Sequence, residues 1–150
     1  MDSHATTPYR YSALSRGILG GLFVGIITAV LNLAFDYIYR KITHYQAAEY
    51  VNINSIIFFT IPTLVAAGIV YSIIIRFVKR GVLVYTILSL ILTLIVTFIP
   101  LGPNMLPNGE MMPPTSRGLT MGIVILTGLM GAFALPYFAE HPRVWSDTNK

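Results

Sequence analysis

Four polar residues follow one another at intervals of four in the first long apolar segment of the chain: Thr28, Asn32, Asp36 and Arg40. On a helix this spacing places them in one row. Asp36 has the richest chemistry, because a carboxyl group in apolar surroundings can take up a proton or, with Asn32, bind a cation. The alternative, which we favour, is an ion pair with Arg40 one helical turn further on. Asn32 lies deeper in the segment, where we expect a hydrogen bond to another helix.

A second polar row occurs in the third apolar segment, where Thr86, Ser89, Thr93 and Thr97 share one side of a helix. These hydroxyl groups either form the polar lining of a path or pocket, or bond back to carbonyl groups one turn earlier. We favour the second interpretation. If the hydroxyl groups are instead a functional lining, Thr93 and Thr97 would join Asp36, Asn32 and Thr28 in a site that binds a ligand or couples an ion.

Other chemistry finds little support in the sequence. It contains no cysteine and no nucleophile elbow, zinc-protease helix or P-loop motif, so we expect no enzyme. Met105, Met111 and Met112, with His44, have ligand types that suit Cu(I), but they lack regular spacing and we expect no metal site. Any cofactor is left open.

The composition then identifies the elements that carry these residues. Of 150 residues, 55% are hydrophobic and only 11% are charged, whereas a soluble domain has about 25% charged residues. Four segments reach the length of about 20 apolar residues that a membrane-crossing helix needs. They cover about residues 17–39, 55–77, 82–99 and 119–138. We predict an all-α protein with one domain (1–150), an integral membrane bundle of four antiparallel helices in contact with lipid.

The basic residues predict the orientation of this bundle. Seven of the ten lysines and arginines lie before the first segment, at the end of the second or between the second and third, or after the fourth. The other three are Arg40, Lys41 and Arg117. Because basic residues collect on the cytoplasmic side, both termini are predicted to be cytoplasmic. Lipid headgroups explain the net charge of +4 without a nucleic-acid partner. The small size, short loops and missing glycosylation sequons favour a bacterial cytoplasmic (inner) membrane.

Small residues provide the expected packing surfaces. Gly17, Gly21 and Gly25 are spaced by four and form a groove that lets another backbone approach closely. The fourth segment carries further glycines, at Gly122, Gly128 and Gly131. The first segment is therefore predicted to pack against the fourth, or against a second copy of the protein. Pro62 is expected to kink the second segment and to favour a pocket there.

Several weakly specific features occur together between residues 54 and 137. They are Ser55, Thr60, Ala66-Ala67, the basic turn from Arg76 to Arg80, Pro100, Met121, Ala132 and Pro136. In this region the chain resembles an uncharacterised family of small bacterial four-span membrane proteins. It departs from the pattern at Gly122, where a histidine is expected. The resemblance implies the fold, but it carries no activity and no functional residues.

Three functions follow as hypotheses. The first is a non-enzymatic accessory subunit or self-associating scaffold, which binds another membrane protein or its own copy through small-residue helix faces. The second is a small ion- or proton-coupled transporter or channel that uses Asp36. The third is a protein that binds a lipid, quinone or pigment between its helices, near Pro62.

Overall fold

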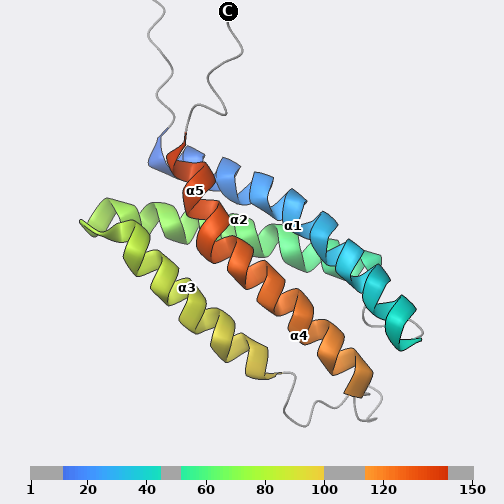
Figure 1. Cartoon of the computed structure of the whole chain (residues 1–150). Coiled ribbons are helices and arrows are strands. Elements are labelled where there is room, and N and C mark those ends of the chain that lie inside the picture. The colour runs from blue at the N-terminus through green and yellow to red at the C-terminus, as the bar shows by residue number, and fades with distance from the viewer. Residues whose placement is uncertain (1–11, 45–51, 100–113, 142–150) are drawn as a thin grey trace, which may run out of the picture.

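The protein consists of four long helices (Figure 1) in a computed structural model that describes residues 12–44, 52–99 and 114–141. Three of them are α1 (Ala13–Thr43), α2 (Ile53–Phe77) and α3 (Gly81–Phe98). The fourth joins α4 (Pro114–Leu129), a π-helical segment (Met130–Ala134) and α5 (Leu135–Glu140). The described ranges contain no strand, which confirms the all-α prediction. All four helices are long and apolar enough to cross a membrane.

The observed helices contain the predicted spans, apart from Ile99, which lies one residue beyond α3. Two of the helices start at side chains that satisfy free backbone amide groups. Ser12 Oγ accepts a hydrogen bond from the Ser15 amide at 3.1 Å, and Asn52 Oδ1 accepts one from the Ser55 amide at 2.8 Å. α1 ends at His44, whose left-handed backbone (φ 52°) stops the helix. Met105, Met111 and Met112 lie outside the described residues.

Consecutive helices run in opposite directions (Figure 1). The start of α1, the α2–α3 turn and the end of α5 are therefore at the same end of the bundle, which we call the termini end. There the Ser72 hydroxyl donates to the Ala13 carbonyl at 3.0 Å, and the Tyr71 hydroxyl donates to Glu140 Oε1 at 3.3 Å. The opposite end, where α1 and α3 finish and α2 and α4 begin, is called the loop end.

The core lies nearer the termini end and draws on all four long helices. Its buried members are Val24, Leu64, Tyr71, Tyr85, Leu135 and Ala139. The rings of Tyr71 and Tyr85 meet edge to face with their centroids 5.1 Å apart. In α3, by contrast, only Gly81, Tyr85 and Thr97 are buried. Most of this helix is therefore exposed on the periphery of the bundle.

The glycine row of α1 packs against α2 and not against the fourth helix, so that part of the prediction is wrong. A Cβ atom on Gly17 or Gly21 would collide with the backbone of α2, at the carbonyl oxygens of Gly68 and Leu64. Gly25 lies in the same row, where a Cβ atom would come within 3.3 Å of the Ile61 Cα atom. The physical reason is that α2 has its own gap at Gly68, so the two backbones meet directly.

The glycines of the fourth helix make room for side chains rather than for a backbone. A Cβ atom on Gly122 would overlap the Phe35 ring, and one on Gly128 would overlap Thr93. A Cβ atom on Gly131 would lie 3.1 Å from its nearest neighbour, Leu64 Cδ2. Helix α1 does approach α5, but through Gly20, where a Cβ atom would lie 3.6 Å from that of Ala139. The predicted packing glycines thus all face neighbours within the chain.

The π-helical segment leaves carbonyl groups free, and α3 compensates for them. The Leu135 amide donates to the carbonyl of Met130, five residues back, and Pro136 has no amide hydrogen to offer. The Gly131 carbonyl instead accepts a hydrogen bond from the Tyr85 hydroxyl at 3.1 Å. The Ala132 carbonyl accepts one from the Thr86 hydroxyl at 3.2 Å. These two bonds attach α3 to the fourth helix.

Candidate functional site

Asn32 forms the centre of a buried polar cluster that joins three helices. Its side chain is completely buried, and Nδ2 donates to Thr60 Oγ1 on α2 at 3.0 Å and to Thr127 Oγ1 on α4 at 2.9 Å. The predicted helix–helix hydrogen bond of Asn32 is therefore present twice. The amide oxygen, Oδ1, is buried and has no partner in the described part of the chain. Such a group is costly to bury, which makes the cluster a candidate functional feature.

A cavity of about 390 Å³ lies directly beside this cluster, between α2, α3 and α4. Thr60 and Thr127 are part of its wall, whereas Asn32 stands behind them. The volume falls within the range of small-molecule sites, about 300–1,000 Å³. Phe59 and Leu92 also line the cavity and are 69% and 59% exposed, so the cavity reaches the apolar outer surface of the bundle.

The wall is apolar with a few hydroxyl groups. Its apolar members include Leu64, Ala67, Leu92, Val96, Ile123 and Val124. Its hydroxyl groups belong to Thr60, Thr63, Ser89, Thr93 and Thr127. All lining residues that the structure describes are uncharged. A site of this kind suits a molecule with a large apolar body and a small neutral polar group.

Asp36 lies away from this cavity, at the loop end. Its carboxylate oxygen Oδ1 is 2.8 Å from Arg40 Nε, so the ion pair expected as the alternative to a coupling role is present. The Asp36 side chain is 8% exposed and that of Arg40 21%. The pair borders an open hollow of about 660 Å³, which Asn52 and Tyr37 also line. The ion pair satisfies the largely buried Asp36 carboxylate, which gives the residue a structural role.

The structure does not bring together the five residues predicted to bind a ligand or couple an ion. Asn32 and Thr93 adjoin the α2–α3–α4 cavity, but Asp36 does not line it. The Thr28 hydroxyl is fully buried and donates to the Val24 carbonyl at 2.7 Å. Thr93 and Thr97 donate to the carbonyl groups of Ser89 and Thr93, each at 2.7 Å. This is the back-bonding that we favoured for those two residues.

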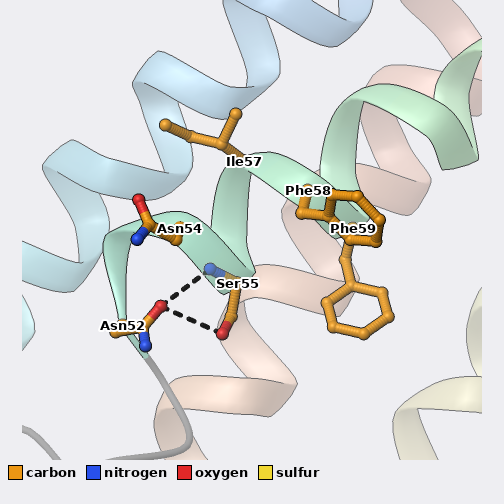
Figure 2. Close-up of a pocket in the computed structure, with 6 residues that line it drawn as sticks. All are labelled: Asn52, Asn54, Ser55, Ile57, Phe58 and Phe59. Carbon is orange, nitrogen blue, oxygen red and sulfur yellow. Dashed lines mark hydrogen bonds between the residues drawn. The ribbon is translucent and has the colours of Figure 1, made fainter.

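A third hollow, of about 440 Å³, surrounds the start of α2 (Figure 2). Within it, Asn52 Oδ1 accepts hydrogen bonds from both the amide and the hydroxyl group of Ser55. Phe58 and Phe59 extend outward beside this cap (Figure 2). We interpret the arrangement as a helix cap and not as a ligand site. Within residues 12–44, 52–99 and 114–141, no three His, Cys, Asp or Glu side chains lie close enough together to hold a metal ion.

Sequence reasoning did not place Thr60 and Thr127 in the candidate site. Each is an isolated hydroxyl group in an apolar run, and nothing nearby in the sequence marks it as a partner of Asn32. One usable signal was Asn32 itself, since an amide in an apolar segment needs polar partners.

Comparisons with known proteins add no relative to this description. No family model, curated protein or solved structure matches the chain. The resemblance to small bacterial four-span membrane proteins therefore stays a prediction.

Proposed function

We propose that this is an integral membrane protein that binds a neutral lipophilic molecule in the cavity between α2, α3 and α4. The observation that carries the proposal is the cavity itself, with an uncharged, mostly apolar wall that opens on the apolar surface of the bundle. A molecule dissolved in the bilayer would reach it sideways, without crossing water. The role is binding rather than catalysis, because the described lining offers no acid, base or charged group.

Membrane insertion is supported by the outer surface of the helices. Large apolar side chains are exposed along the whole of α3, including Leu83 at 54%, Leu94 at 61% and Phe98 at 58%. In water such a continuous apolar surface would drive aggregation, whereas lipid tails solvate it. We propose that both termini are cytoplasmic, following the excess of basic residues at the termini end, and that the membrane is a bacterial cytoplasmic membrane.

The first of the three hypotheses loses its main support. It required small-residue faces that are open to a partner, but the glycine row of α1 is covered by α2, and Gly122 and Gly128 are covered by Phe35 and Thr93. Association with a second copy or another membrane protein remains a prediction that needs a different surface. The transporter hypothesis is also weaker, because Asp36 is paired with Arg40 and lies outside the cavity.

The proposed insertion predicts opposite labelling of the two ends of the bundle. The chain has no cysteine, so single-cysteine variants can be labelled without background. Lys79→Cys, in the exposed α2–α3 turn, should react with a membrane-impermeant maleimide only from the cytoplasmic side. Asn54→Cys, exposed at the loop end, should react only from the opposite side. Labelling of both positions from one side would contradict a membrane-crossing α2.

Binding is tested by filling the cavity. Ala67 lines the cavity, and the adjacent Ala66 is exposed and lies outside the lining. Native mass spectrometry of the detergent-purified protein should detect about one retained lipophilic molecule per chain in the wild type. Ala67→Phe should lose this molecule, because the ring occupies its space, and the matched variant Ala66→Phe should keep it. A wild-type protein that retains nothing, or equal retention by both variants, would contradict the proposal.

A further inference from the structure

We infer that the cavity recognises a hydrogen-bond acceptor, so that its ligand is a neutral lipophilic carbonyl compound of the quinone class. This inference rests on the proposed function and specifies the chemistry of the same site. It follows from how Asn32 uses the two hydroxyl groups at the cavity wall.

The hydrogen bonds from Asn32 determine whether the hydroxyl groups of Thr60 and Thr127 can donate a further hydrogen bond. Its amide hydrogens point to Thr60 Oγ1 and Thr127 Oγ1, so each oxygen acts as an acceptor toward Asn32. Each hydroxyl group then has its hydrogen left to donate. In many helices a threonine donates this hydrogen to the carbonyl group one turn earlier, as Thr28, Thr93 and Thr97 do here. Within the described part of the chain, the side-chain hydrogen bonds of Thr60 and Thr127 are those with Asn32.

Thr60 and Thr127, which carry the two donors, line the same cavity from two different helices, α2 and α4. A bound carbonyl oxygen has two lone pairs and can accept from both. A charged headgroup would find no counter-charge in the described lining, and burying it would be costly. A plain hydrocarbon would leave both hydroxyl hydrogens unused. A flat ring system with carbonyl groups satisfies the donors and fills the apolar remainder of the wall.

The experiment compares two probes with the same carbon skeleton on the full-length wild-type protein. They are 2-methyl-1,4-naphthoquinone and 2-methylnaphthalene, each titrated at matched mole fraction in detergent micelles, with the unfolding temperature as the readout. Hydrogen bonds from two hydroxyl groups should make the quinone bind about tenfold tighter than the hydrocarbon. The preference should fall to about onefold in the variant Thr60→Val/Thr127→Val.

Two further variants separate recognition from folding. Thr60→Ser/Thr127→Ser keeps both hydroxyl groups and should keep the preference for the quinone. Thr63→Val changes a hydroxyl group that lines the cavity but has no bond to Asn32, and it should also keep the preference. Should the double valine variant fail to fold, the wild-type comparison of the two probes still decides the inference.

Each outcome has a distinct meaning. Equal affinity of the wild type for both probes overturns the inference, while binding in the cavity as such remains supported. Binding of neither probe, together with a ligand retained in native mass spectrometry, also overturns the inference and leaves the proposed function. Binding of neither probe and no retained ligand overturns both. Retention of phospholipid alone assigns the cavity to a membrane lipid and overturns the inference of a quinone.

Discussion

Replacement of Gly68 by alanine should lower the free energy of unfolding by about 1–3 kcal/mol, the usual cost of overpacking a tight interface. The added Cβ atom would collide with the carbonyl oxygen of Gly17 and would lie 3.4 Å from the Gly21 Cα atom. Neither contact is with a flexible side chain that could turn away, so α1 and α2 must separate along their length. The measurement is unfolding in mixed detergent micelles, followed by circular dichroism.

Gly20→Ala is the matched control for this prediction. Gly20 is also a buried helical glycine, but a Cβ atom there would lie 3.6 Å from the nearest atom, an ordinary van der Waals contact. This variant should unfold like the wild type or be slightly more stable, because alanine favours helix over glycine. If Gly68→Ala is as stable as Gly20→Ala, the close approach of the α1 and α2 backbones is wrong.

The second large effect is expected at the attachment of α3. The variant Tyr85→Phe keeps the ring against Tyr71 but removes the hydroxyl group that donates to the Gly131 carbonyl. An unsatisfied buried carbonyl costs about 1–3 kcal/mol. Adding Thr86→Val removes the donor to the Ala132 carbonyl as well. The double variant should lose more than either single variant, though less than their sum, because both act on the same segment.

Tyr137→Phe provides the control for Tyr85→Phe. Tyr137 lies in the adjoining α5, is 59% exposed and stacks its ring on His141 at 4.5 Å between centroids. Its loss of a hydroxyl group should change the free energy of unfolding by less than about 0.5 kcal/mol. Equal stabilities of Tyr85→Phe and Tyr137→Phe would show that the phenol does not compensate for the π-helical segment and Pro136.

These contacts together explain why a cavity exists in so small a bundle. Helices α1 and α2 meet backbone to backbone through Gly17, Gly21 and Gly68. Helix α3 is held in another way, through the Tyr85 and Thr86 hydroxyl groups at the π-helical segment and through Thr93 against Gly128. Because α3 leaves the α2–α3 turn at an angle and follows the fourth helix (Figure 1), the space between α2 and α3 widens toward the loop end.

Local properties of the sequence were sufficient to predict the four helices. Hydropathy and helix length depend only on consecutive residues, so the spans follow directly, as does the i, i+4 pair of Asp36 and Arg40. The back-bonding of Thr93 and Thr97 is equally local. For the same reason the sequence identified Gly17, Gly21 and Gly25 as a close-packing surface, since the spacing of four is a property of one helix.

Only the tertiary structure decided what those surfaces meet. The prediction assigned the glycine row of α1 to the wrong helix. It left out Gly68, which lies one turn before Ser72 on α2 and forms the gap that receives this row. The partners of Asn32 are 28 and 95 residues away along the chain, and the cavity draws on three helices at once. Such contacts depend on the rotation and crossing of whole helices, which the pattern of any single helix leaves undetermined.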